Sequence, residues 1–145
     1  MVKMICSLLG IGYYSTTSMR DLSNKEVKKI VKLTLRYCEN NLGVNRRKST
    51  PLSLVMCDNP YDECYLGEYD PVDNQINIFT DEIGSLGALT STIVHEYTHY
   101  LQPILTKYAK MLDEYGYDDH PYEVEARDNE RIHNRRVLAY IRENM

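Results

Sequence analysis

The chain has no tryptophan and a single phenylalanine, so 13 tyrosines supply nearly all of its aromatic side chains. A tyrosine buries its apolar ring while its hydroxyl keeps a polar partner or water. We therefore expect most of these side chains to be half-buried at the margin of a core. Hydrophobic residues still make up 43% of the 145 residues, which is enough for the core of a single domain.

Cysteine is scarce as well, because the four cysteines include no C-x-x-C pair. Such a set is too sparse for a scaffold held together by disulfides, and it favours reduced thiols in a cytoplasmic protein. A second metal or redox pair formed by Cys57 and Cys64 is the less favoured interpretation.

Long apolar runs and long basic runs are both lacking. No stretch is apolar over the length that a transmembrane helix needs. The short run from Met4 to Ile11 is not followed by a clean cleavage site, so we interpret residues 1–20 as an N-terminal extension and not as a signal peptide. The net charge is −4 and the basic clusters, Arg46-Arg47-Lys48 and Arg135-Arg136, are short, so neither a nucleic acid nor a membrane is an expected partner.

Residues 21–145 are predicted to form one α+β domain. A capping box of Ser23 and Glu26 begins an amphipathic helix that ends near Gly43. Three strand candidates follow, at residues 52–56, 64–69 and 74–79. Turn residues at 70–73 join the last two strands as a hairpin, which predicts a small, mostly antiparallel sheet of about three strands.

Three helices are predicted after the strands. They span about residues 86–102, 104–115 and 121–142, with Pro103, Gly116 and Pro121 at their boundaries. Gly67, inside the second strand candidate, predicts either a bulge or the close approach of another part of the chain.

The first of these helices contains the segment His95-Glu96-Tyr97-Thr98-His99. Positions four apart lie on one face of a helix, so both imidazoles can bind one metal ion. This is the H-E-x-x-H signature of zinc hydrolases, in which the glutamate takes a proton from the attacking water. The sequence therefore predicts Zn²⁺ as the cofactor and Glu96 as the general base.

A catalytic zinc site needs a third protein ligand, and we expect it from the last helix. The best carboxylate cluster there contains Glu123 and Glu125, and the small Ala126 allows that helix to pack closely on the motif helix. Glu123 is the predicted ligand.

An H-E-x-x-H motif followed about twenty-four residues later by Glu-x-x-Ala resembles the gluzincin group of zinc peptidases, in particular the small minigluzincin and ImmA/IrrE-like members. The chain is also similar to short H-E-x-x-H proteins of phage, which have a Gly-Glu-Tyr-Asp strand pair before the motif and a His-Pro-x-Glu-x-Glu-Ala segment after it. The resemblance covers roughly residues 20–142. It implies a minimal zincin-like fold with an N-terminal helix, a small sheet, the motif helix and a C-terminal helix that carries the third ligand.

Carried over to this chain, the resemblance makes His95, His99 and Glu123 the zinc ligands and Glu96 the catalytic base. It also implies that the strand from Asn74 to Phe79 is an edge strand, along which an extended peptide or protein substrate pairs.

One position departs from the family pattern. Many relatives have Asp or Asn four residues after the ligand Glu, where it orients a zinc-bound histidine, and this chain has Arg127. A guanidinium group cannot accept that hydrogen bond. Either Asp128 or Asn129 takes over the role, or Glu125 is the true ligand and Asn129 lies four residues beyond it.

Peptide hydrolysis also needs a donor for the developing oxyanion. Candidates lie in or beside the connector before the last helix, namely Tyr115, Tyr117, His120 and Tyr122. From this set His120 and Tyr117 are the assigned catalytic candidates.

Three function classes remain open at this point. The first is a zinc-dependent peptidase. The second is an ImmA/IrrE-like regulatory metalloprotein that acts on one specific partner, such as a repressor. The third is a non-catalytic binding module, which would have a closed metal site with a fourth protein ligand. A DNA-dependent protease of the SprT kind is less favoured because this acidic chain lacks a basic DNA-binding segment.

Overall fold

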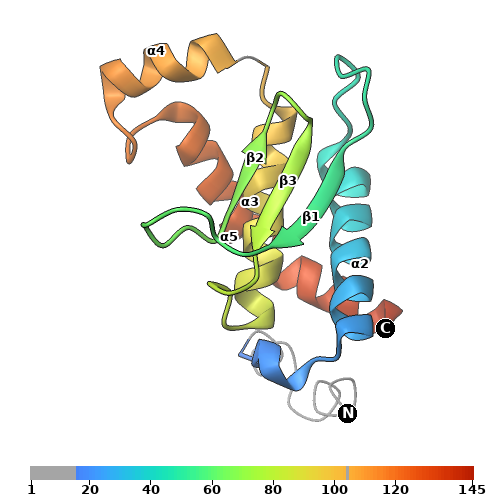
Figure 1. Cartoon of the computed structure of the whole chain (residues 1–145). Coiled ribbons are helices and arrows are strands. Elements are labelled where there is room, and N and C mark those ends of the chain that lie inside the picture. The colour runs from blue at the N-terminus through green and yellow to red at the C-terminus, as the bar shows by residue number, and fades with distance from the viewer. Residues whose placement is uncertain (1–15, 104) are drawn as a thin grey trace.

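The computed structural model describes residues 16–103 and 105–145 (Figure 1). The apolar run at residues 4–11 and most of the predicted N-terminal extension lie outside the described residues. The part of that extension that the structure describes is hydrogen-bonded to a later segment of the chain. The carbonyl of Thr17 accepts a hydrogen bond from the Leu86 amide at 2.8 Å, and a short 3-10 helix, η1, follows at Met19–Asp21.

The helix α2 (Asn24–Leu42) begins and ends where its caps predict. The Ser23 hydroxyl accepts a hydrogen bond from the Glu26 amide at 3.2 Å, and the Glu26 carboxylate accepts one from the Ser23 amide at 2.7 Å. The predicted capping box is therefore confirmed. Gly43 ends the helix with a φ of +91°, a conformation that favours glycine.

In the described part of the chain the sheet contains three strands, β1 (Ser53–Cys57), β2 (Gly67–Asp70) and β3 (Gln75–Phe79), in the order β1-β3-β2. β2 and β3 are antiparallel, which confirms the predicted hairpin, whereas β1 and β3 are parallel. The prediction of a mostly antiparallel sheet is therefore wrong, and the sheet is mixed. The physical reason is that the hairpin inserts its second strand between its first strand and β1.

The same order corrects the predicted edge strand. The strand predicted from Asn74 to Phe79 is β3, which lies in the middle of the sheet and is hydrogen-bonded to a neighbour on both sides. Its backbone therefore has no free edge for a substrate. Among the residues that the structure describes, β1 and β2 are the edge strands.

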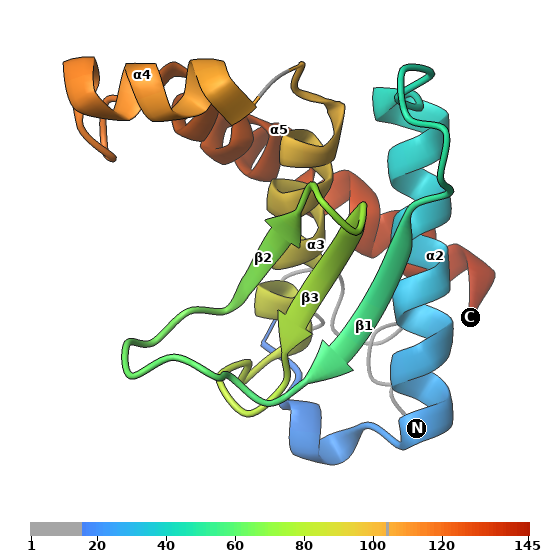
Figure 2. The same ribbon diagram turned by 45° about the horizontal axis from the view of Figure 1, so that its top comes forward.

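Three helices follow the sheet, α3 (Leu86–Leu101), α4 (Leu105–Tyr115) and α5 (Pro121–Asn144). α3 lies behind the sheet in both views, and α5 packs against α3 on the side away from the strands (Figures 1 and 2). α4 stands apart from the sheet. The predicted α+β class is confirmed. None of the helices in the described part of the chain has both the length and the apolar character required to cross a membrane.

The hydrophobic core lies between these layers. It includes Ile30 and Cys38 of α2, Ile76 and Ile78 of β3, Leu89 and Ile93 of α3, and Val137 and Ile141 of α5.

Three tyrosines, Tyr37, Tyr97 and Tyr100, lie fully inside this core, although the composition predicts half-buried positions. Each finds a hydrogen-bond partner there. The Tyr37 hydroxyl is 2.8 Å from Nδ1 of His133, and the Tyr100 hydroxyl accepts a hydrogen bond from the Asn45 amide at 3.1 Å. Because their hydroxyl groups are paired, these rings can be buried completely.

Candidate metal centre

The local sequence of α3 places its two histidines side by side. Ser85 caps the helix by accepting a hydrogen bond from the Ala88 amide at 3.1 Å, and Pro103 follows its last turn. His95 and His99 are separated by about one helical turn, and their ring centroids are 4.9 Å apart. Two imidazoles are thus available on one face.

The start of α5 brings a carboxylate to this pair. Pro121 and Glu123 both lie in the first turn of the helix. Ala126 is fully buried, so its small side chain allows α5 to lie close to α3. Glu123 is only 3% exposed, whereas Glu125 is exposed to solvent. The structure therefore brings Glu123, and not Glu125, to the two histidines.

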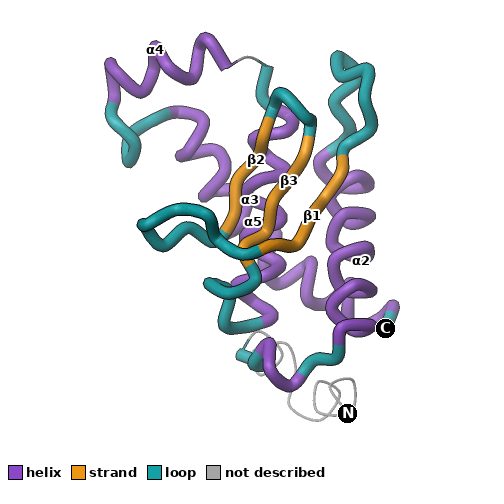
Figure 3. Tube along the Cα trace, viewed as in Figure 1, coloured by secondary structure: helices purple, strands orange, loops and turns teal. Residues whose placement is uncertain are grey.

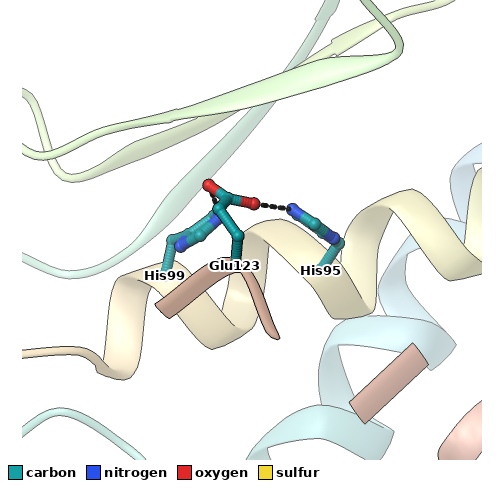
Figure 4. A group of neighbouring side chains, drawn as sticks. All are labelled: His95, His99 and Glu123. Atoms are coloured by element: carbon teal, nitrogen blue, oxygen red, sulfur yellow. Dashed lines mark hydrogen bonds and ion pairs between the residues drawn. The ribbon is translucent and has the colours of Figure 1, made fainter. Parts of the chain in front are cut away.

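Figure 4 shows the Glu123 carboxylate between the two imidazoles. Its Oε2 is 3.1 Å from Nε2 of His95, and its Oε1 is 3.1 Å from Nε2 of His99. One ligand atom from each of the three residues lies within 4.8 Å of the others. Ligands bound at about 2.0–2.1 Å to a tetrahedral zinc are roughly 3.3 Å from one another, so this donor set could hold one metal ion after small side-chain adjustments.

The other nitrogen of each imidazole has a partner of its own. His95 Nδ1 is 2.8 Å from a carboxylate oxygen of Glu130, and His99 Nδ1 is 2.7 Å from the amide oxygen of Gln102. An acceptor at Nδ1 fixes the ring orientation and leaves the Nε2 lone pair for a metal. Both imidazoles are therefore held with Nε2 toward Glu123.

Sequence reasoning missed Glu130, although a signal for it exists. It lies seven residues after Glu123, which is about two helical turns and hence the same face of α5. The predicted substitutes for the family's Asp or Asn have other partners. Asn129 donates a hydrogen bond to the Thr98 hydroxyl at 3.0 Å, and Asp128 is exposed.

The protonation of the three candidate ligands is strongly coupled. Burial opposes the charged form of His95, yet hydrogen bonds to Glu123 and Glu130 raise its pKa to about 10. Burial likewise opposes the charge on Glu123, but hydrogen bonds from His95 and His99 bring the pKa of Glu123 well below its usual range. Protons and a metal ion compete for the same Nε2 atoms, so metal binding at this site releases protons.

Glu96 lies beside this group and is 8% exposed. Burial raises the pKa of Glu96, while the neighbouring His99 and His95 act in the opposite direction. A buried carboxyl group next to a candidate metal site, with a raised pKa, has the properties of a general base that can also return a proton.

The centre opens into a cleft of about 650 Å³ that is lined by His95, His99, Glu123 and Glu96. β2 and the loop before it form one side of the cleft. That loop, residues 58–66, extends away from the sheet in Figure 3. Tyr108 of α4 lines the helical side, and its hydroxyl donates a hydrogen bond to Glu123 at 2.8 Å. A cleft of this volume is typical of sites for small ligands.

The two predicted oxyanion donors differ in their placement. Tyr117 is 56% exposed and lines the cleft, so it stays a candidate. His120 is fully buried. Its Nδ1 accepts a hydrogen bond from the Tyr122 amide at 3.1 Å, and its Nε2 is 2.9 Å from the carbonyl oxygen of Tyr108.

The assignment of His120 as a catalytic residue is therefore corrected. Both of its ring nitrogens are used by backbone groups, and its side chain caps the N-terminus of α5. The sequence places His120 near the candidate ligand Glu123 but does not show which way its ring faces.

No protein-family model matches the chain, and neither a curated protein nor a solved structure is significantly similar to it.

Proposed function

We propose that the protein is a zinc-dependent peptidase of the gluzincin type, with His95, His99 and Glu123 as zinc ligands and Glu96 as general base. One observation carries the proposal. Two imidazole nitrogens and a carboxylate converge next to a second, buried carboxylate at an open cleft. Three protein ligands leave a fourth position for water, as in catalytic zinc sites.

A bound zinc ion would act as a Lewis acid, lowering the pKa of water and polarising the substrate carbonyl. The side chains of the protein do the rest. Glu96 takes the proton of the attacking water and passes it to the leaving amine. Tyr117, at the cleft wall, is the candidate donor to the developing oxyanion.

The free edge of β2 is the proposed place for the substrate backbone. Within residues 16–103 and 105–145, β2 has β3 on one side only, and its residues Gly67, Glu68 and Tyr69 line the cleft. An extended peptide can add to such an edge as a further strand, with its backbone amides and carbonyls paired. This proposal replaces β3 by β2 as the strand that binds the substrate.

Replacement of the base tests the mechanism. Glu96→Gln keeps the size of the side chain but removes its capacity to accept a proton. We expect peptide hydrolysis to fall by roughly 10² to 10⁴, while zinc content and melting temperature stay near those of the wild type. Digestion of a random peptide mixture, followed by mass spectrometry, measures the activity.

The matched control is Glu125→Gln, which makes the same change at an exposed position and should leave hydrolysis unaltered. Unchanged hydrolysis in Glu96→Gln would refute the assigned base. A zinc-loaded wild-type protein that cleaves no peptide in the mixture would refute the general peptidase and leave the regulatory metalloprotein and the non-catalytic binding module as alternatives.

A further inference from the structure

Glu68 of β2 is a carboxylate held in a fixed position at the wall of the cleft. One of its oxygens accepts a hydrogen bond from the Tyr61 hydroxyl at 2.7 Å, and the other accepts one from the Asn77 amide nitrogen at 3.1 Å. Each carboxylate oxygen can accept about two hydrogen bonds, so both oxygens keep acceptor capacity for a further partner. Glu68 is therefore oriented by neutral donors and not saturated by them.

No cation neutralises this carboxylate among the residues that the structure describes. The salt bridges there involve Glu123, Glu130 and Asp128, and none includes Glu68. Lys48 is the one described lysine or arginine that lines the cleft, and its amino group lies 5.9 Å from the centre of the Tyr69 ring. A half-buried carboxylate without a counter-charge can bind a cationic ligand through charge-assisted hydrogen bonds.

Two exposed aromatic rings share the cleft wall with Glu68, and one of them, Tyr61, is hydrogen-bonded to it. Tyr61 and Tyr65 are 48% and 46% exposed and both line the cleft. Their rings pack edge to face with centroids 5.5 Å apart, and Tyr61 packs in the same way on Phe79 at 6.0 Å. The face of a tyrosine ring attracts ammonium and guanidinium groups. These rings are therefore suited to cover the apolar stem and the charged head of a basic side chain.

We propose that Glu68, Tyr61 and Tyr65 form a subsite that binds a lysine or arginine side chain of the substrate, so that the protein selects basic peptides. The inference rests on the proposed function in taking a peptide as the ligand of the cleft. An ammonium or guanidinium group seated there donates hydrogen bonds to Glu68 and contacts the tyrosine rings. An acidic side chain at the same place would face the Glu68 carboxylate and be repelled.

Binding of matched peptides tests the subsite without any turnover. Blocked hexapeptides of alanine, each with one lysine at a different position, are compared by fluorescence anisotropy with peptides in which norleucine replaces that lysine. The full-length protein is measured in the presence of a chelator, so that no peptide is hydrolysed. We expect lysine at one position to lower the Kd by about tenfold relative to norleucine, and added salt to reduce that advantage.

Two variants test whether the preference for lysine comes from the subsite or from general electrostatic attraction. Each variant removes one negative charge from this region. Glu68→Gln should abolish the preference for lysine. Glu63→Gln should keep it, because Glu63 is exposed and does not line the cleft, and its carboxylate accepts a hydrogen bond from the Tyr65 hydroxyl at 2.6 Å that a glutamine oxygen can also accept. Equal Kd values for the lysine and norleucine peptides on the wild-type protein would overturn the proposal, whatever the folding of the variants. A preference that persists in folded Glu68→Gln would overturn it as well.

These results are independent of the catalytic proposal. A preference for lysine in binding, together with no hydrolysis of any peptide by the zinc-loaded protein, would refute the peptidase and leave the subsite standing. Hydrolysis that depends on Glu96 but is indifferent to basic residues, together with equal peptide affinities, would refute the subsite and leave the peptidase standing.

Discussion

At the scale of single residues, each candidate zinc ligand is held by a neighbour that is not a ligand. Glu130 accepts a hydrogen bond from His95, and the amide oxygen of Gln102 accepts one from His99. The Tyr108 hydroxyl donates a hydrogen bond to Glu123. Such neighbours fix the ligand atoms before a metal arrives and thereby reduce the ordering that binding requires. The three donor atoms consequently lie close together.

Removal of the Glu130 carboxylate should weaken zinc binding although it removes no ligand. In Glu130→Ala, Nδ1 of His95 loses its acceptor and the ring its orientation, so we expect the affinity for zinc to fall by about 10- to 100-fold. Competition with a chelating dye measures the Kd. Glu125→Ala removes an exposed carboxylate from the same helix and should bind zinc like the wild type. Identical affinities in both variants would contradict the assigned role of Glu130.

The sequence predicts the candidate site residues of α3 because the spacing within one helix fixes which side chains share a face. The two histidines and Glu96 follow from that spacing alone. Spacing did not identify Glu130, and it led to a catalytic role for His120, because the contacts of both residues lie between helices, α5 with α3 and α5 with α4. Local spacing does not define such contacts.

At the scale of elements, Gly67 allows β2 to lie against α3. A Cβ atom at this position would be 2.8 Å from the carbonyl oxygen of Asn77 and 2.9 Å from the side chain of Thr92 on α3. The first of these neighbours is backbone and cannot move aside cheaply. Of the two predicted roles of Gly67, the close approach is therefore confirmed.

Gly67→Ala should destabilise the fold, since the added methyl group overlaps both neighbours. We expect the free energy of unfolding to fall by roughly 1–3 kcal/mol in urea denaturation, the usual range for overpacking. Gly84→Ala is the matched control, because a Cβ atom at Gly84 would meet nothing within 4 Å, and its effect should stay within about 0.5 kcal/mol. A loss of stability in Gly84→Ala as large as that in Gly67→Ala would show that the close approach is not the cause.

The sequence predicts where the helices begin better than it predicts the order of the strands in the sheet. The capping box at Ser23 and Pro121 in the first turn of α5 are local signals, and the helices begin there. The hairpin of β2 and β3 is local too. The position of β1 beside β3, and not beside β2, depends on contacts across the core, which short-range patterns leave open.

At the scale of the whole molecule, the candidate centre joins two helices that are distant in the sequence. His95 on α3 and Glu123 on α5 are 28 residues apart, and α4 lies between them in the chain (Figure 1). The choice between Glu123 and Glu125 thus required the packing of α5 on α3, which buries one side chain and exposes the other. A zinc ion bound at this junction would link the two helices and stabilise the folded chain over the unfolded one.

The zinc content of three purified proteins tests this account most directly. After dialysis against a low concentration of zinc and removal of the excess, elemental mass spectrometry counts the zinc atoms per chain. We predict about one zinc per chain for the wild type and for Glu125→Ala, and close to none for Glu123→Ala, because that variant lacks the third ligand of a catalytic site. Zinc retained at the wild-type level in Glu123→Ala, or lost in Glu125→Ala, would contradict the account.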